Sequence, residues 1–475
     1  PTWSEVESAG AQPTPSDGNV LFVTSSSGRE SSRALSASYD PQRVYFIEYG
    51  APLAARSERA WGVRPDNASE LERILSRMPP LAHIYFVGGV QETEGDPSDL
   101  DRTQRHQEEG VVGLFRLVKL LEKGGYGNRA LTLTVVTRGA CKVDPGDVLV
   151  PGAASVVGFS RSLAKEFATW KVVFIDLPAG ELTRPDEALA FAASGGSCGR
   201  ELALRRGRLH RRGLLPATIP PGQAAFRKGG TYLILGGTGG IGIELAKHLA
   251  GKYHASVALV GRRPLDARIS AALRELEALG GRGLYVQADA GRPEELASAV
   301  QTVQQRLGVI HGAFHSAIVL EDGTLAQMGE DALRAVLAPK VTGSVSLYRA
   351  LSGQPLDFLA FLSSAQSFVG SAGQSNYAAA CAFKDAYALG LDARCAFPVR
   401  VINFGYWGEV GIVATEAYRR RLAAQGVHAI STRVGIEAVE RVLGAGAEQV
   451  AVLKGTRELL TSIGVDWSRT IHVLG

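Results

Sequence analysis

The chain has 475 residues, of which 45% are hydrophobic and 21% are charged, as in soluble globular proteins rather than disordered or fibrous ones. This length favours two domains over one. The net charge of +4 is too small and too evenly spread to indicate a nucleic acid partner, and no apolar run reaches the roughly 18 residues that a membrane span needs.

The cysteines and the start of the chain indicate its context. Cys141, Cys198, Cys381 and Cys395 form no CxxC pair and have no metal-ligand spacing. This pattern suits a cytoplasmic protein in a reducing compartment, with no metal site. No signal peptide precedes the first strand. The chain begins at Pro1 without methionine, so we expect it to be part of a longer polypeptide.

Short β-branched runs alternate with amphipathic stretches along the first half, which is the pattern of parallel α/β units. Asn67 and Glu70 have the spacing of a capping box at the start of one predicted helix. Helices are predicted over residues 68–77, 110–123 and 154–167. Strands are predicted over residues 19–25, 43–49, 83–89, 131–137 and 171–178.

The second half repeats this plan after a proline-containing seam at residues 204–228. We place the boundary inside the seam, which gives an N-terminal subdomain 1–222 and a C-terminal subdomain 223–475. The charged run "LRRGRLHRR" within the seam is interpreted as a solvated edge or an interdomain strand. Strands are predicted over residues 231–237, 256–262, 283–289, 312–318, 357–364, 399–404 and 449–453.

A glycine-rich turn distinguishes the two halves. After its first strand, the second half reads "GGTGGIG" and then continues as a predicted helix. Glycines there permit a tight turn and let backbone N–H groups approach a pyrophosphate at the helix N-terminus. The first half has "SSSGRESS" instead, with bulky Arg29 and Glu30. The fold class is therefore α/β with two Rossmann-like subdomains, and only the second has a cofactor site, formed by Gly236, Gly237, Thr238, Gly239, Gly240, Ile241 and Gly242.

Residues after the next strands indicate which dinucleotide binds. Arg262 and Arg263 stand where an acidic residue would accept the ribose hydroxyls of NAD, so they favour the 2′-phosphate of NADPH. The alternative is that both are ordinary surface arginines. Asp289, at the end of the third strand, can meet the adenine amine or cap the helix that begins near "GRPEEL".

The stretch "GQSNYAAACAFKD" contains the candidate acid, Tyr377, downstream of the serine pair Ser363 and Ser364. A tyrosine four residues before a lysine is the familiar acid of one large reductase family. On a helix, residues four apart lie on the same face. Here the fourth residue is Cys381, and the nearest lysine, Lys384, is seven residues away. The local sequence therefore leaves open which cation acts on Tyr377.

Several motifs together resemble one family. "GGTGGIG", "LVGRR", "FLSSAQSFVGSAGQSNYAAACAF" and "INFGYWG" are similar to the ketoreductase domain of modular polyketide synthases, a member of the short-chain dehydrogenase/reductase superfamily. In the first half, "LTVVTRGA", "GAASVVGFSRSLAKEF" and "VVFIDLP" resemble the catalytically silent structural subdomain of those ketoreductases. The resemblance extends over nearly the whole chain.

The resemblance implies a catalytic set. The lysine has moved to the preceding helix, where Lys340 in "LAPKVTG" matches it. Tyr377 would donate a proton to the carbonyl oxygen, Ser364 would hydrogen-bond that oxygen, and NADPH would deliver hydride. A nearby ammonium would lower the tyrosine pKa from its usual value of about 10. Further cofactor contacts are implied for Ala290, Ser316, Ala317 and Gly405.

Cys381 departs from the family, in which asparagine is usual at this position. A thiol cannot replace the two-sided hydrogen bonding of an amide. Three interpretations are possible. The domain is inactive, or it is active because backbone or water replaces the missing amide, or it belongs to a branch in which cysteine is normal at this position. We favour the last interpretation, because "GQSNYAAAC" and "GYWGEVG" resemble ketoreductases of assembly lines whose acyltransferase acts in trans.

The segment "SAIVLEDGTL" bears on stereochemistry. Leu320, Glu321 and Asp322 resemble the Leu-Asp-Asp signature of B-type ketoreductases, which give a D-configured hydroxyl. Val369 stands where A-type domains have tryptophan. The alternative is a polar turn with Gly323.

The implied substrate is a β-ketoacyl thioester on the phosphopantetheine of an acyl carrier protein, with other domains of the same megasynthase as further partners. The candidate substrate contacts are Gln374, Tyr406 and Trp407. Alternatively, Gln374 closes the loop, and Tyr406 and Trp407 are ordinary buried aromatic residues. Residues 409–431 correspond to a mobile lid. Alternatives are reduction of an α-ketoacyl group by the same residues, or a non-catalytic scaffold domain.

Overall fold

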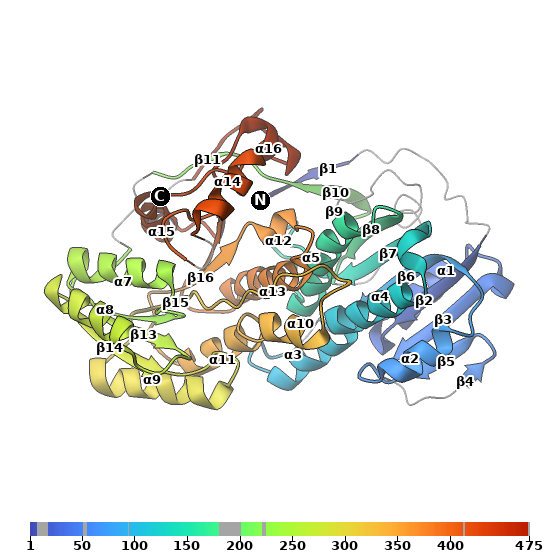
Figure 1. Cartoon of the computed structure of the whole chain (residues 1–475), viewed down its shortest axis with the longest axis horizontal. Coiled ribbons are helices and arrows are strands. Elements are labelled where there is room, and N and C mark those ends of the chain that lie inside the picture. Colours follow the sequence, from blue (N-terminus) through green and yellow to red (C-terminus); the bar gives the residue numbers. More distant parts are fainter. Residues whose placement is uncertain are drawn as a thin grey trace.

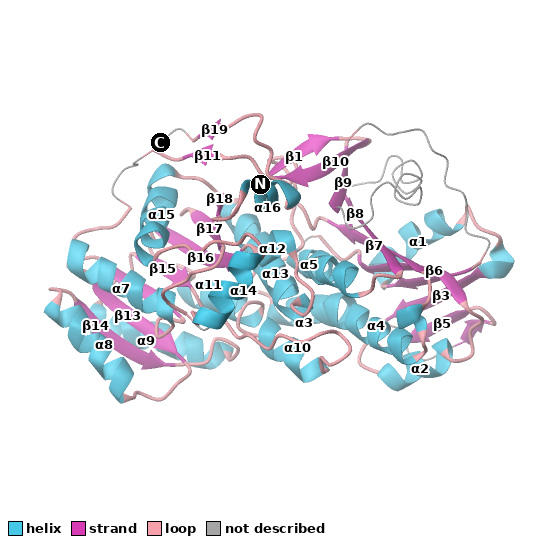
Figure 2. Cartoon of the chain, turned by 45° about the horizontal axis from the view of Figure 1, so that its top comes forward, coloured by secondary structure: helices cyan, strands magenta, loops and turns pink. Residues whose placement is uncertain are grey.

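The computed structural model describes residues 1–6, 18–50, 55–93, 95–179, 201–220, 225–411 and 414–473. These residues form two β-sheets with helices on their faces, one sheet in each half of the chain (Figures 1 and 2). The predicted α/β class with two Rossmann-like subdomains is confirmed. The predicted boundary between residues 222 and 223 lies outside the described residues. Among those residues, no helix has the length and apolar character needed to cross a bilayer.

The sheet of the first, structural half has the order β1-β10-β9-β8-β7-β6-β2-β3-β5-β4. Its central part is β5-β3-β2-β6-β7-β8. When these six strands are numbered along the chain, their order is 3-2-1-4-5-6, which is the Rossmann order. The strands are β1 (Thr2–Glu5), β2 (Asn19–Thr24), β3 (Val44–Tyr49), β4 (Ala55–Ser57), β5 (Ala60–Val63), β6 (Leu81–Gly89), β7 (Leu131–Arg138), β8 (Trp170–Leu177), β9 (Glu201–Arg205) and β10 (Arg208–Gly213).

The helices of this half pack their apolar faces on that sheet. Asn67 caps α2 as predicted, because its side-chain oxygen accepts the N–H of Glu70 at 3.1 Å. The helices are α1 (Arg29–Ser36), α2 (Ala68–Leu75), α3 (Leu100–Gln107), α4 (Gly113–Lys123) and α5 (Pro151–Glu166), with a π-helical turn at Glu108–Val112 before α4.

The second, catalytic half has a parallel sheet in the order β14-β13-β12-β15-β16-β17-β18. The first strand, β12, lies at the centre, with β13 and β14 added on one side of it and β15 to β18 on the other. Where the strand order reverses in this way, a crevice forms at the carboxyl ends of the strands. The strands are β12 (Thr231–Leu235), β13 (Ser256–Gly261), β14 (Arg282–Gln287), β15 (Gly312–His315), β16 (Phe358–Ser364), β17 (Val399–Phe404) and β18 (Gln449–Val452).

Helices cover both faces of the catalytic sheet (Figure 2). The helices are α7 (Gly240–Tyr253), α8 (Ala267–Ala278), α9 (Pro293–Leu307), α10 (Glu330–Leu337), α11 (Thr342–Leu351), α12 (Gln366–Val369), α13 (Ser375–Asp392), α14 (Glu416–Ala424), α15 (Thr432–Ala445) and α16 (Arg457–Ser462). A short parallel pair, β11 (Ala217–Thr218) and β19 (Ile471–His472), joins the seam to the end of the chain.

An internal ion pair stands at the strand ends of the structural half. Glu48 lies near the end of β3, where an acid would meet the ribose in a nucleotide-binding Rossmann unit. Here the Arg29 guanidinium lies 2.5 Å from the Glu48 carboxylate. The carboxylate is thus bound to the protein itself, and the absence of a dinucleotide site in this half stays a prediction.

The two halves meet along α5 and α13, which lie side by side at the centre of the molecule (Figure 1). A methyl group added to Gly158 would lie 2.5 Å from the backbone oxygen of Ala378 and 2.7 Å from the side chain of Ala382. Only small residues allow this approach. The helix that carries Tyr377 therefore rests directly on the structural half.

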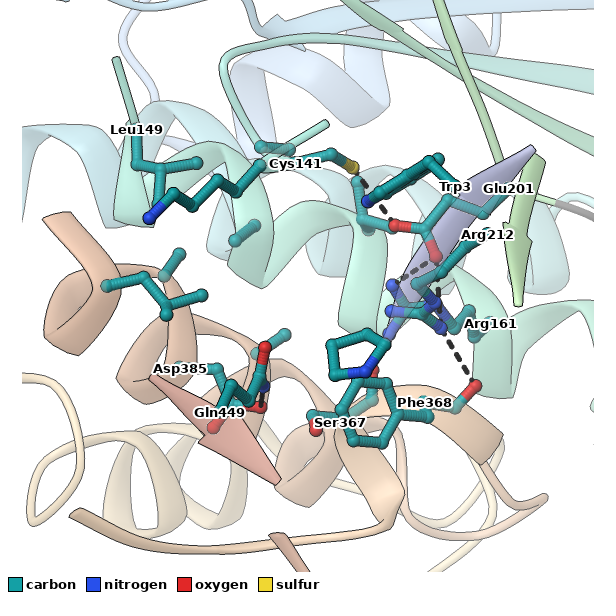
Figure 3. A pocket seen from close by; sticks show the side chains of 18 residues that line it. Trp3, Cys141, Leu149, Arg161, Glu201, Arg212, Ser367, Phe368, Asp385 and Gln449 are labelled. Atoms are coloured by element: carbon teal, nitrogen blue, oxygen red, sulfur yellow. Dashed lines mark hydrogen bonds and ion pairs between the residues drawn. The ribbon is translucent and has the colours of Figure 1, made fainter. Parts of the chain in front are cut away.

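A charged cluster is buried beside that contact (Figure 3). The Glu201 carboxylate lies 2.7 Å from the Arg161 guanidinium and 3.0 Å from that of Arg212. Arg161 and Arg212 also donate to the backbone oxygens of Ser367 and Phe368, on α12 of the catalytic half. The cluster thus connects the structural sheet to a helix between Ser364 and Tyr377.

The charged run at 204–212 is only in part what the sequence suggested. Arg212 does contact the other half, so the interdomain interpretation is correct. The solvated-edge interpretation is wrong, because β10 lies between β1 and β9 rather than at the edge. Arg205 is also only 3% exposed and pairs with Asp147 and Asp176 at 2.9 and 2.8 Å. Its partners are distant in sequence and could not be foreseen.

Candidate active site

The glycine-rich turn after β12 has the geometry that a phosphate-binding turn needs. Gly236 has φ of +83°, and a methyl group there would lie 2.6 Å from the backbone nitrogen of Ala317. A methyl group on Gly242 would lie 2.8 Å from the backbone oxygen of Gly236. Helix α7 begins at Gly240 with no side-chain cap, so its first N–H groups remain available for an anion. The turn fits a bound dinucleotide.

One cavity extends from this turn along the carboxyl ends of β12, β13 and β14. The predicted cofactor residues that line it are Gly236, Thr238, Gly239, Gly240, Arg262, Arg263, Asp289, Ala290, Ser316 and Ala317. Gly237 and Gly242 do not line it and instead permit close backbone packing. Ile241 and Gly405 line the adjoining cavity described below.

Two further arginines line the cofactor cavity and were not predicted. Arg268 lies on α8, and Arg292 precedes α9; both helices follow strands whose ends form the cavity. Their position shortly after these strands was the available signal. Four arginines, including Arg262 and Arg263, thus line this cavity.

Asp289 does not cap the following helix. Its Oδ1 accepts the N–H of Gly291 at 2.8 Å, whereas the N-cap position of α9 is Arg292. The helix-cap alternative is therefore wrong. Asp289 does line the cofactor cavity, so contact with the adenine amine stays a prediction.

Ser364, Tyr377 and Lys340 come together in a second cavity. Ser364 ends β16 and Tyr377 is in the first turn of α13. Lys340 lies in the turn between α10 and α11 rather than on a helix. The Lys340 ammonium lies over the Tyr377 ring, 5.0 Å from its centroid. Lys340 is therefore the lysine that the structure places beside Tyr377 in this cavity.

Burial raises the pKa of Tyr377 well above its ordinary value; the neighbouring Cys381 raises it further, and a hydrogen bond with Ser364 lowers it. The expected shift toward neutral pH is therefore not observed in this structure. Burial is the largest cause of the shift, and Lys340, 5.0 Å from the ring centroid, does not offset it. Tyr377 consequently carries its proton at neutral pH, as a proton donor must.

Cys381 lies one turn after Tyr377 and is completely buried. Its proximity raises the pKa of Tyr377 further, beyond the effect of burial. Burial outweighs the attraction of Lys340 and raises the pKa of Cys381. The thiol is therefore neutral at physiological pH, which argues against a nucleophilic role.

Lys384 has a structural place. It is completely buried, and its ammonium donates to the backbone oxygens of His315 at 2.9 Å and Leu362 at 2.7 Å. It thereby ties the ends of β15 and β16 together. Lys384 does not line the cavity at Tyr377.

The substrate side of the cavity contains most of the predicted contacts. Leu320, Gln374, Tyr406 and Trp407 line it. Glu321 and Asp322 are exposed and do not line it. The Gln374 amide donates to the Asp322 carboxylate at 2.7 Å, so Asp322 can act on the cavity through Gln374.

The predicted lid region contributes helix α14. Tyr418 and Leu422, four residues apart on this helix, line the cavity at Tyr377 and were not singled out in the sequence. Their helical spacing was the available signal. The Tyr418 ring lies 5.6 Å from that of Tyr406, measured between centroids.

The arrangement defines a class of protein. A parallel Rossmann sheet carries a glycine turn on its first strand and places a serine, a tyrosine and a lysine in an adjoining cavity, as in the short-chain dehydrogenase/reductase class. Among the described residues, no cluster of acidic, histidine or cysteine side chains could hold a metal ion.

Comparisons with known proteins identify the family. The family described as "KR domain" matches residues 230–409, and the family "Polyketide synthase extender module SpnB, Rossmann fold domain" matches residues 58–214. Polyketide synthase ThaG of Burkholderia thailandensis is 39% identical over 82% of the chain, and polyketide synthase PksN of Bacillus subtilis is 33% identical over 96%. The chain belongs to the ketoreductase domain family of polyketide synthases.

The fold is shared with a solved ketoreductase. The crystal structure of an N-terminal ketoreductase from the macrolactin assembly line matches with a TM-score of 0.79 at 20% identity, over 97% of this chain and 92% of that one. In contrast, the chain covers only 7% of ThaG and 8% of PksN.

Proposed function

We propose that this domain reduces a β-ketoacyl thioester to a D-β-hydroxyacyl thioester with NADPH, on an acyl carrier protein of a polyketide synthase. One observation carries the proposal. The cavity that contains Tyr377, Ser364 and Lys340 and the cavity at the glycine turn meet, because Gly240, Ser316, Ile318 and Gly411 line both. A cofactor in one cavity can therefore reach a substrate in the other.

The residues have distinct roles in this proposal. Bound NADPH supplies the hydride. Tyr377, protonated at neutral pH, donates the proton that neutralises the developing alkoxide. The Ser364 hydroxyl donates a hydrogen bond to the same oxygen, and the buried Lys340 ammonium stabilises the negative charge left on Tyr377.

The choice of NADPH rests on the arginines around the cofactor cavity. Charge-assisted hydrogen bonds contribute about 1.5–3 kcal/mol each. We therefore expect the double variant Arg262→Ala, Arg263→Ala to weaken NADPH binding by about 10²–10⁴-fold and to leave NADH binding nearly unchanged. Fluorescence titration with both cofactors measures this. Arg274→Ala, an exposed arginine on α8 outside the cavity, is the control. Equal losses for NADPH and NADH would contradict the assignment.

Two features support a D-configured product. Leu320 lines the cavity beside Gln374, which is bonded to Asp322. Val369 also lines the cavity, where a tryptophan would fill more space. We also propose that the domain belongs to the lineage in which acyltransferases act in trans.

Substitution of Cys381 tests whether catalysis depends on cysteine at the position where asparagine is usual. A thiol is a weak hydrogen-bond partner, so Cys381→Ala is expected to lower kcat by less than about tenfold, well below the effect of a lost general acid. Steady-state kinetics with saturating NADPH would measure it. A loss above a hundredfold would assign sulfur an essential part in proton transfer.

The proposed function is tested with the purified domain, NADPH and a 2-methyl-3-ketoacyl thioester. Cofactor absorbance and chiral chromatography of the product are followed together. Turnover to the D-hydroxy product supports the proposal, whereas an L-hydroxy product overturns the stereochemical part. A 2-ketoacyl thioester offered in parallel tests the α-keto alternative. Tight NADPH binding without turnover of either substrate, also when carrier-bound, would support the scaffold alternative.

A further inference from the structure

The end of helix α5 contacts two loops of the catalytic half that border the substrate cavity. The Leu320 loop is defined here as residues 318–329, and the Gln374 loop as residues 370–374. Each loop contributes a residue to the cavity wall, Leu320 and Gln374 respectively. Helix α5 belongs to the structural half, which contains no residue of the catalytic set.

Glu166, the last residue of α5, binds both loops at once. Its Oε2 accepts the backbone N–H of Leu325 at 2.6 Å, and its Oε1 accepts the backbone N–H of Gly373 at 3.0 Å. Both oxygens of one carboxylate are thus used on two segments far apart in sequence. Hydrogen bonds to a charged acceptor are stronger than those between neutral groups.

The two loops are also bonded to each other around this carboxylate. The N–H of Gly323 donates to the backbone oxygen of Gly373 at 2.8 Å. The Gln374 amide donates to Asp322 at 2.7 Å. The separation that Glu166 fixes between the loops therefore also sets the position of Gln374 in the cavity wall.

Two lysines of the structural half support the same loops through their carbonyl groups. Lys119 on α4 donates to the backbone oxygens of Leu325 and Ala326, both at 2.8 Å. Lys165 donates to those of Val369 at 3.0 Å and Gly370 at 2.6 Å. Each lysine thus reaches a single loop or the residue just before it, and Lys119 also pairs with Glu122 at 3.7 Å. Glu166 is the side chain of the structural half that binds backbone N–H groups of both loops.

We propose that Glu166 is a positioning residue for stereoselectivity: from the structural half, it fixes the Leu320 and Gln374 loops so that the substrate is presented to Tyr377 by one face. This inference rests on the proposed ketoacyl reduction. It gives the structural half a part in selecting the product, besides its support of α13.

The test uses Glu166→Gln in the whole chain, because glutamine keeps the shape but offers only one acceptor oxygen. We expect hydrogen exchange in peptides covering residues 322–328 and 370–376 to become about tenfold faster. We also expect the ratio of major to minor hydroxy product to fall about tenfold with a 2-methyl-3-ketoacyl thioester. Tm and NADPH affinity should be unchanged, which separates positioning from a general loss of structure.

Glu72→Gln is the matched control, since Glu72 is a carboxylate of the same half that pairs with Lys123 away from these loops. It should alter neither exchange in the two loops nor the product ratio. An unchanged product ratio in Glu166→Gln, or unchanged exchange in both loops, would overturn the proposal. Wild-type protein that reduces no ketoacyl thioester would defeat the proposed function instead, and the exchange comparison would still decide whether Glu166 holds the loops.

Discussion

Replacing Tyr377 with phenylalanine is expected to lower kcat by about 10²–10⁴-fold, the usual contribution of a positioned general acid. The substitution removes one hydroxyl and keeps the ring, over which Lys340 lies. NADPH affinity should stay within about threefold of wild type, because Tyr377 lies outside the cavity at the glycine turn. Stopped-flow measurement of NADPH oxidation gives the rate, and fluorescence titration gives the affinity.

Tyr387→Phe is the matched control for this variant. Tyr387 lies on the same helix and is buried, but its hydroxyl donates to the backbone oxygen of Pro97 in the structural half. Its loss should leave kcat within about threefold of wild type. Equal rates for Tyr377→Phe and wild type would show that another group supplies the proton.

The second large effect concerns stability. Glu201→Gln is expected to lower the free energy of unfolding by about 3–5 kcal/mol, the cost of removing one partner from a buried ion pair. Arg161 and Arg212 would then be left without their shared carboxylate in the interface between the halves (Figure 3). Urea unfolding followed by circular dichroism measures the change. Glu72→Gln, at an exposed pair, should change stability by less than about 0.5 kcal/mol.

The same carboxylate predicts a pH dependence. Burial acts to raise the pKa of Glu201, but Arg161 and Arg212 outweigh it, so the pKa lies below its ordinary value of 4.5. The unfolded chain therefore binds this proton more readily than the folded one. The contribution of Glu201 is present above pH 4.5 and is lost as the pH falls through the lower folded-state pKa. Wild type should lose more stability on acidification than Glu201→Gln; parallel pH profiles would contradict this.

Local motifs explain why much of the site could be predicted. The glycine turn, the serine at the end of β16 and Tyr377 each lie at a strand or helix end that the sequence pattern defines. The seven strands of the catalytic sheet and β2, β3, β6, β7 and β8 of the structural sheet were predicted, because β-branched runs mark them. The short strands β1, β4, β5, β9 and β10 were not predicted. Lys340 required the family resemblance, since a single lysine in a turn has no local signature.

Contacts between distant segments explain what could not be predicted. Glu166 has no signal in the sequence, because its two partners lie on distant segments of the catalytic half. Arg205 looked solvated, because Asp176 lies on another strand. The contact between Asp322 and Gln374 could likewise not be predicted, because it forms only when the two loops meet. In each case tertiary structure decides the role of a charged residue.

These contacts give the silent half a physical purpose. It carries α5, against which the Tyr377 helix packs at Gly158. It also supplies Arg161 to α12, and Glu166 to the two substrate-side loops. Helix α13 and both loops are thus held from one rigid side, which suits a site that must present its substrate in one orientation.

The most direct test of the central claim is the transfer of hydride between the two connected cavities. The domain would be incubated with NADPH deuterated at C4 of the nicotinamide and a 2-methyl-3-ketoacyl thioester, and the product analysed by mass spectrometry and NMR. The account predicts one deuterium on the carbinol carbon of a D-hydroxy product, formed about 10²–10⁴-fold more slowly with Tyr377→Phe. Product without deuterium at that carbon, or cofactor oxidation without reduced thioester, would contradict it.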